Sequence, residues 1–305
     1  SDNYKKRFES YGWNFLDIDG HNEKQISKAI LKASKSNKPT LISCKTIIGF
    51  GSPNKSGKSS SHGSPLGEEE ITLVRKKLKW NHPPFEIPKQ ILDEWNKIGE
   101  KGEILENKWE EKLNKKNSKI KNELKEIYIG SSLGNLEKLI ESEKLKYFEA
   151  KPSLATRQCS MAAIEIISNL LPQLIGGSAD LSGSNNTKTN NSKIINSKNF
   201  NGNYIHYGVR EHGMAAVMNG LALYGGMIPY GGTFLIFSDY CKPSIRLSAL
   251  MGLKVIYIFS HDSIGLGEDG PTHQPIEQLT GLRAIPNLNV FRPADMNETL
   301  ECWEI

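Results

Sequence analysis

The sequence has no long hydrophobic run and no closely spaced pair of cysteines. No apolar stretch reaches the roughly 18 residues that a membrane-spanning helix needs. The first residues, SDNYKKRFESYG, lack the apolar segment of a signal peptide. The cysteines lie far apart, at Cys44, Cys159, Cys241 and Cys302. This spacing argues against a zinc site or a disulfide framework and is typical of reduced thiols. We therefore expect a soluble, cytoplasmic protein with no membrane segment.

The sequence also lacks a strong excess of either charge. It has 39 lysines and arginines and 34 acidic residues, which gives a net charge of only +5 over 305 residues. This surplus could attract anionic substrates weakly, although a solvated surface is the simpler interpretation. No basic run alternates with aromatic residues, so nucleic-acid binding is not indicated. Hydrophobic residues make up 37% of the chain, which is enough for one large domain or two ordinary ones.

The N-terminal part alternates between strand and helix patterns. Residues 13–18 and 40–48 are apolar and β-prone. Between them, apolar residues recur at helical spacing, at Ile26, Ala29, Ile30 and Ala33. A strand, a helix and a strand joined by short connections predict a parallel sheet, and hence an α/β fold.

A glycine-, serine- and lysine-rich loop, 49–67, follows, and a loop of this length is either functional or disordered. Residues 67–80 then predict a helix that buries Ile71, Val74 and Leu78. Residues 88–147 are rich in lysine and glutamate and predict surface helices with an interdomain linker.

A second α/β unit begins after residue 150. Ile164, Ile167 and Leu171 predict a helix, and residues 214–221 predict another. Residues 255–259 form a continuous apolar run, which predicts a strand covered on both faces. The stretch 182–203 is rich in Asn, Ser and Lys and predicts a long mobile loop, and a further helix opens after Pro293.

The segment HDSIGLGEDGPTHQP, residues 261–275, carries the densest chemistry. It follows the predicted buried strand and precedes a helix, so it lies at the carboxyl end of a strand, where open α/β sheets bind ligands. Two histidines and two acids share a glycine-rich loop. A structured turn with capping residues is the alternative, but packing alone explains so many titratable groups poorly.

Three other segments carry candidate residues. In YIHYGVREHGM, Glu211 falls at a strand-to-helix junction, where a helix cap and a chemical role are equally good interpretations. In GTFLIFSDY, the spacing of three between Phe234, Phe237 and Tyr240 predicts one helical face, which is more often core than cofactor pocket. TRQCS and GGSADLSGS present three further polar side chains, Arg157, Asp180 and Ser184.

Taken together, these segments resemble the transketolase family. The chain carries, in the family's order and at its spacings, KTIIGFGSPN with SHGSPLG, GGSADL, YGVREHGM, TFLIFSDY and HDSIGLGEDGPTHQP. The resemblance runs from about residue 7 to the last residue and is weakest across 100–150 and 185–203. The set is specific, because 1-deoxyxylulose-5-phosphate synthase and pyruvate dehydrogenase share the fold but differ at the GLGEDGPTHQP position.

The resemblance implies the thiamine-diphosphate-binding fold: parts of two three-layer α/β domains with parallel sheets, joined by a helical linker. Residues 1–120 would be the C-terminal part of the diphosphate-binding (PP) domain, 121–150 the linker, and 151–305 an incomplete pyrimidine-binding (Pyr) domain. The family's GDG…N motif, which holds Mg²⁺ and the diphosphate, would precede residue 1. A further phosphate-binding arginine would follow residue 305, and Arg292 does not match it. We therefore expect a fragment with no metal ligand of its own.

The resemblance also implies which residues would bind thiamine diphosphate. Glu211 matches the glutamate that hydrogen-bonds the aminopyrimidine ring and promotes proton loss from the thiazolium carbon. Phe234, Phe237 and Tyr240 match the aromatic pocket around that ring, which reverses the interpretation of these residues as core. The remaining cofactor contacts would be His62, Asp180 and Leu181.

Substrate contacts follow from the same resemblance. His62, His261 and His273 match the active-site histidines, which bind donor hydroxyls and the carbonyl and can shuttle protons near neutral pH. Asp269 matches the residue that reads the configuration of a substrate hydroxyl. Phosphate contacts would come from Arg157, whose guanidinium suits a phosphate, and from Ser184.

The implied activity is reversible transfer of a two-carbon ketol unit from a ketose phosphate, such as xylulose 5-phosphate, to an aldose phosphate, such as ribose 5-phosphate. Such enzymes serve the pentose phosphate pathway or the Calvin cycle and are homodimers with active sites at the subunit interface. This chain alone is expected to be inactive. The alternatives are dihydroxyacetone synthase, which uses formaldehyde as acceptor, and a non-catalytic subunit, against which the presence of Glu211 and His261 argues.

Overall fold

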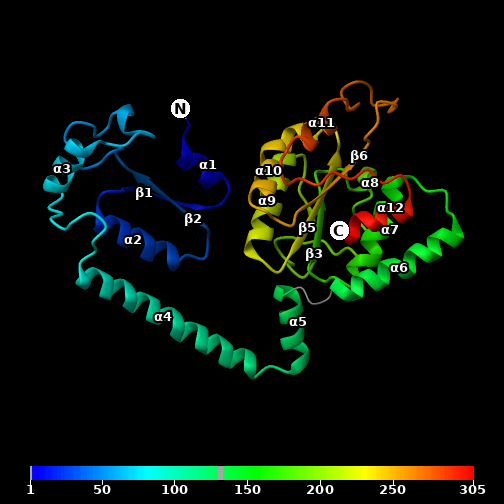
Figure 1. Cartoon of the computed structure of the whole chain (residues 1–305), viewed down its shortest axis with the longest axis horizontal. Helices are drawn as coiled ribbons and strands as arrows, with labels where there is room; N and C mark the ends of the chain where they lie inside the picture. Colours follow the sequence, from blue (N-terminus) through cyan, green and yellow to red (C-terminus); the bar gives the residue numbers. More distant parts are fainter. Residues whose placement is uncertain (1, 130–132) are drawn as a thin grey trace. The chain divides into compact units, whose positions relative to one another are not determined.

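The computed structural model describes residues 2–129 and 133–305, which form two compact units that divide between Asn107 and Lys108 (Figure 1). Among the described residues, no helix is both long enough and apolar enough to cross a membrane.

The first unit contains the predicted strand, helix and strand. After α1 (Tyr4–Ser10), strand β1 (Asn14–Asp19) and strand β2 (Thr40–Lys45) pair in parallel, with Asn14 opposite Thr40. Helix α2 (Glu23–Ser34) connects them and buries Ala29, whereas Ile30 of the predicted apolar face is exposed. The parallel α/β arrangement predicted from this region is confirmed.

Helix α3 (Glu68–Lys77) was predicted with the wrong buried face. Ile71 is 44% exposed and Leu78 is 54% exposed, while Glu70 is buried. The cause is polar: the Glu70 carboxylate accepts hydrogen bonds from the preceding loop, so this side of the helix turns inward. The loop itself contains a 3-10 turn, η1 (Ser59–Ser61).

Helices fill the middle of the chain: α4 (Lys89–Asn114), α5 (Ser118–Ile129) and α6 (Leu133–Ala150). Helix α6 contributes Leu136 and Ile140 to the main core of the second unit. The predicted helix after residue 150 is α7 (Thr156–Ser168), which adds Ile164 and Ile167 to the same core. This core therefore joins two helices that are consecutive in the chain.

The second unit is built on a parallel four-stranded sheet in the order β4-β3-β5-β6. The strands are β3 (Leu174–Ser178), β4 (Tyr204–His206), β5 (Ile228–Phe234) and β6 (Ile256–Ser260). Helices α9 (Glu211–Tyr224) and α10 (Ser238–Leu250) cover one face, and α6, α7 and α12 (Met296–Glu304) cover the other (Figure 1). The result is a three-layer α/β fold.

Strand β6 is covered on both faces, as predicted, because Ile256 and Ile258 pack against the core on one face of the sheet and Tyr257 and Phe259 against the core on the other. It is half-buried along its length, since it lies at one edge of the described sheet. The expectation for the segment that follows β3 was wrong. The segment expected as one long loop, 182–203, instead begins with a helical turn, α8 (Ser182–Asn185), and buries Asn185 and Thr187. Side-chain hydrogen bonds to the sheet anchor it, which its polar composition did not indicate.

Candidate functional site

The candidate site of the second unit lies at the carboxyl ends of β5 and β6. Phe234 is the last residue of β5 and pairs with Ser260, the last residue of β6, so both strands end at the same edge of the sheet. His261 follows directly, with a left-handed φ of 53°. Its imidazole stacks on the Phe234 ring, with 3.8 Å between ring centroids. The strand pairing thus brings a histidine from one segment onto a phenylalanine from another.

His273 and Phe237 complete this ring cluster. Phe237 stacks on Phe234 at 5.5 Å, and His273 meets Phe237 edge-on at 5.3 Å and Phe234 at 6.0 Å. Tyr240 lies at the margin, 6.0 Å from Phe237, and is 67% exposed. The two predicted histidines and the predicted aromatic residues therefore meet in one place.

The predicted helical face of Phe234, Phe237 and Tyr240 was wrong. Phe234 ends strand β5, Phe237 is the residue before α10, and only Tyr240 is helical. Their rings still approach one another, because the chain turns sharply from the strand into the helix. Spacing by three therefore reflected a strand-to-helix turn.

His261 has a pKa below its ordinary value. Burial is the main cause, because it disfavours the charged imidazolium, and the guanidinium of Arg157 acts in the same direction. The carboxylates of Asp269 and Asp262 oppose the shift, and His273 adds to it. Ser260 Oγ lies 2.9 Å from the Nδ1 atom. The surroundings of His261 therefore favour the neutral imidazole, and they include three other predicted site residues.

Glu211 is the first residue of α9, as the predicted strand-to-helix junction requires. Arg210 holds the N-cap position, so Glu211 does not take the capping role that was its alternative. Burial, reinforced by the charge of Glu211, raises the pKa of the Cys241 thiol to about 12. Cys241 Sγ lies 3.9 Å from the carbonyl oxygen of Phe237. Cys241, in α10, is therefore sensitive to the charge of Glu211 and lies close to the backbone of Phe237 in the ring cluster.

Asp180, Leu181 and Ser184 follow the carboxyl end of β3. Asp180 is exposed and has a left-handed φ of 62°, a conformation in which aspartate is enriched. The backbone N–H of Leu181 donates to Ser178 Oγ at 3.1 Å. Ser184 lies in α8 and its side chain is exposed. Arg157 is exposed near the start of α7.

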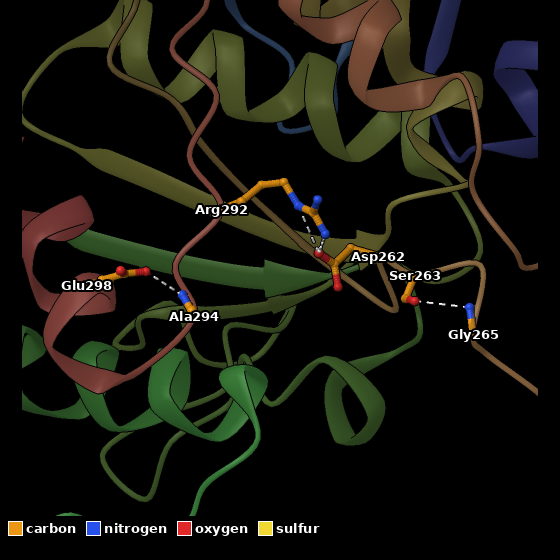
Figure 2. A network of polar contacts seen from close by, with 6 residues as sticks. All are labelled: Asp262, Ser263, Gly265, Arg292, Ala294 and Glu298. Atoms are coloured by element: carbon orange, nitrogen blue, oxygen red, sulfur yellow. Dashed lines mark hydrogen bonds and ion pairs between the residues drawn. The ribbon is translucent and has the colours of Figure 1, made fainter.

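An ion pair between Arg292 and Asp262, which the sequence did not predict, holds the start of the loop after His261 (Figure 2). Arg292 donates to Asp262 Oδ2 from Nη2 at 2.8 Å and from Nε at 3.3 Å. Ser263 Oγ accepts from the backbone of Gly265 at 3.0 Å. Asp262 and Arg292 are 30 positions apart, and no motif spacing relates them. The segment before α12 is thereby tied to the residue next to His261.

His62 belongs to the first unit, where it is exposed and follows η1. Its backbone N–H donates to the carbonyl of Ser59 at 2.9 Å. The surrounding loop is held by Lys55, whose Nζ donates to the carbonyl of Leu66 at 2.8 Å and whose carbonyl accepts from Ser61 Oγ at 2.5 Å. The loop that carries His62 is therefore an ordered structure.

The buried Glu70 of α3 holds the start of this loop by hydrogen bonds. Its carboxylate accepts from Ser52 Oγ, from the Asn54 backbone at 2.8 Å and from Asn54 Nδ2 at 2.9 Å. These hydrogen bonds, led by that of Ser52, lower the pKa of Glu70 to about 2. Glu70 has no distinguishing signal in the sequence, because it is one of three consecutive acids in the first turn of α3.

Comparison with known proteins identifies the chain's relatives. The model of the transketolase thiamine diphosphate binding domain matches residues 1–132, and that of the transketolase pyrimidine binding domain matches 152–305. Transketolase of Cereibacter sphaeroides is 49% identical over 305 residues, which is all of this chain and 46% of that protein. Transketolase of Sinorhizobium medicae is 49% identical over 99% of this chain and 43% of its own length.

Solved structures agree with the sequence relatives. The chain is similar to transketolase from Campylobacter jejuni, with a TM-score of 0.84 and 40% identity over all of this chain and 46% of that one. It is also similar to transketolase of Pichia stipitis in complex with sedoheptulose 7-phosphate, with a TM-score of 0.87 and 35% identity over 100% and 46% of the two chains. The chain spans less than half the length of these relatives. It belongs to the transketolase family.

Proposed function

We propose that the complete protein containing this chain transfers a two-carbon ketol unit between sugar phosphates. The observation that supports this most strongly is the ring cluster of His261, His273, Phe234 and Phe237 at the carboxyl edge of the sheet. The named complexes of Pichia stipitis transketolase with sedoheptulose 7-phosphate and xylulose 5-phosphate indicate the substrate class. The runner-up acceptor is formaldehyde, as in dihydroxyacetone synthase.

The second unit offers groups that fit the pyrimidine part of thiamine diphosphate. The stacked Phe234 and Phe237 rings present a surface for a flat heteroaromatic ring, and Glu211, the first residue of α9, supplies a carboxylate. When bound, the cofactor supplies a carbon that can hold the transferred unit as a stabilised carbanion. Glu211 would hold or accept a proton at the aminopyrimidine ring, and Tyr240, Asp180 and Leu181 would complete the contacts.

The polar residues around the cluster would act on the sugar. His261 and His273 can accept or donate protons at substrate hydroxyls and at the carbonyl, and His62 would join them in the complete site. Asp269 would accept a hydrogen bond from a hydroxyl of one configuration. Arg157 and Ser184 would bind the phosphate, since a guanidinium forms forked hydrogen bonds with it.

Several properties of the complete protein belong to the same proposal. Mg²⁺ is proposed as the metal that accompanies the cofactor; among residues 2–129 and 133–305, no three His, Cys, Asp or Glu side chains form a metal-binding group. We propose a cytoplasmic homodimer whose sites combine the PP domain of one subunit with the Pyr domain of the other. The domain boundaries at 120 and 150 remain a prediction. The chain alone would be inactive.

The test uses the complete protein with thiamine diphosphate and magnesium. Xylulose 5-phosphate and ribose 5-phosphate are expected to give sedoheptulose 7-phosphate and glyceraldehyde 3-phosphate, which balances the carbon atoms. A reaction without thiamine diphosphate serves as the control. Product formed only with formaldehyde would favour dihydroxyacetone synthase, and no product with any acceptor would favour a non-catalytic subunit.

A further inference from the structure

The short helix α8 carries the predicted phosphate contact Ser184, and a buried tyrosine lies beneath it. Tyr204 of β4 has no exposed surface. Its hydroxyl donates to Ser182 Oγ at 2.8 Å and is 2.9 Å from Thr187 Oγ1. One hydroxyl group therefore joins a residue before Ser184 to a residue after it.

A second tyrosine holds the same segment from the neighbouring part of the sheet. The hydroxyl of Tyr230, in β5, donates to the backbone carbonyl of Thr187 at 3.0 Å. Its ring lies directly over Gly176 of β3, where any Cβ atom would overlap it. Glycine at this position is therefore a condition for the tyrosine to reach Thr187.

Burial keeps both hydroxyls in the protonated form that donates. It raises the pKa of Tyr204, against the smaller opposite effect of its bonds to Ser182 and Thr187, and it raises the pKa of Tyr230 as well. At any physiological pH these side chains are neutral hydrogen-bond donors. The hydrogen bonds that hold α8 therefore stay the same over the pH range in which a substrate phosphate changes its charge.

The anchored segment cannot hold its own conformation. Helix α8 is a single turn, and isolated turns are unstable because nucleation costs more than one hydrogen bond returns. It is flanked by two left-handed residues, Asp180 with φ 62° and Asn186 with φ 54°. These conformations are sparsely populated and persist only where surrounding contacts impose them.

We propose that Tyr204 is a positioning residue for sugar-phosphate recognition, acting through Ser182 and Thr187 to fix the exposed side chain of Ser184. This inference rests on the proposed function, because it needs Ser184 to contact a substrate phosphate. Tyr204 itself touches neither substrate nor cofactor. Its effect is therefore on how strongly the enzyme prefers phosphorylated sugars, and less on the chemistry that follows.

The experiment compares ribose 5-phosphate with ribose as acceptors for the complete protein, at saturating xylulose 5-phosphate. The two acceptors differ only in the phosphate, so the ratio of their kcat/KM values isolates its recognition. Tyr204→Phe keeps the ring and removes the hydroxyl. We expect the ratio to fall about fivefold, the factor that corresponds to one hydrogen bond. Thr187→Val, which removes the other hydroxyl at constant shape, is expected to lower the ratio in the same direction.

Tyr257→Phe is the matched control. Tyr257 also forms a hydrogen bond through a partly buried hydroxyl, at 2.9 Å from Ser248 Oγ, but between α10 and β6. Tyr257→Phe therefore tests whether the loss of any such hydrogen bond has a general effect. We expect the ratio of the two kcat/KM values to stay at the wild-type value in this variant. Hydrogen exchange of amides 182–189 is expected to accelerate in Tyr204→Phe and not in Tyr257→Phe.

The outcomes separate the inference from the function on which it rests. A wild-type protein that transfers no ketol unit to either acceptor overturns the proposed function and the role given to Ser184. A working wild type with an unchanged ratio in Tyr204→Phe and Thr187→Val overturns only the positioning role. An equal fall in Tyr257→Phe also overturns it, because the effect would then be general.

Discussion

The two units stabilise their candidate site residues by different means. Among residues 2–107, Ala29 is the only buried hydrophobic residue, while Ser52 and Glu70 are buried polar groups. In the second unit, α7 and the sheet bury a continuous set of side chains that includes Ile164 and Ile167. The loop that carries His62 is therefore held by hydrogen bonds, including those to the Glu70 carboxylate, whereas His261 follows a strand whose side chains pack against buried clusters. We expect the first region to respond to pH and the second to loss of packing.

The largest effect is expected from the core of the second unit. Ile164→Ala removes a fully buried side chain and should lower the free energy of unfolding by about 2–5 kcal/mol. Ile71→Ala, at an exposed position in the first unit, should change it by no more than about 0.5 kcal/mol. Hydrogen exchange of the α7 and α3 amides in the complete protein measures both. Equal costs would remove the contrast between the units.

This contrast also explains how much the sequence could predict. The parallel strands β1 and β2 and the junction at Glu211 follow from local patterns, and both were predicted within one or a few residues. The buried face of α3 could not be predicted, because periodicity assumes that apolar residues turn inward, whereas Glu70 is turned inward by Ser52 and Asn54. The prediction that Phe234, Phe237 and Tyr240 share one helical face was wrong for a related reason. A spacing of three residues does not distinguish a helix from a turn between a strand and a helix.

The candidate site was predicted as a set of residues and not as a geometry. The resemblance named His261, His273, Phe234 and Phe237, which the structure brings into one cluster. Contacts between distant segments had no sequence signal. The hydrogen bonds of Tyr204 to Ser182 and Thr187 depend on the pairing of β3 with β4, which no local pattern contains.

Glu70→Gln should make the loop of the first unit insensitive to acid. The folded pKa of Glu70, about 2, lies below the ordinary value of 4.5. The stability that its ionised form contributes is therefore present above pH 4.5 and lost as the pH falls toward 2. In wild type, hydrogen exchange of amides 52–66, corrected for intrinsic rates, should show this loss of protection. In Glu70→Gln, protection should already be reduced at neutral pH, with Glu69→Gln as the exposed control.

Two substitutions in the second unit are expected to shift the pKa of His261 in opposite directions. Arg157→Gln removes a positive charge and should raise this pKa, whereas Asp269→Asn removes a negative charge and should lower it. Because the wild-type value lies below 6.5, the unfolded chain binds more protons than the native one, and this group disfavours folding as the pH falls through 6.5. NMR titration of the imidazole measures each shift. Shifts of the same sign would contradict the arrangement around His261.

The smallest effect is expected from the Arg292–Asp262 ion pair of Figure 2. Both side chains are more than two-fifths exposed, at 47% and 43%. Arg292→Gln should therefore cost no more than about 1 kcal/mol of stability, and less at high salt. Hydrogen exchange of amides 262–268 at low and high ionic strength measures this loss. An unchanged protection at low salt would show that the pair does not order the loop.

The most direct test of ketol transfer at this site is the effect of Glu211→Ala on formation of sedoheptulose 7-phosphate by the complete protein. Glu23→Ala is the control, because Glu23 also lies in the first turn of a helix and reports the loss of a helix-terminal charge alone. We predict that Glu211→Ala lowers kcat by about 100-fold or more, as expected when a proton-transfer group is removed, while Glu23→Ala retains wild-type turnover. Wild-type turnover in Glu211→Ala would contradict the assignment of this carboxylate to the reaction.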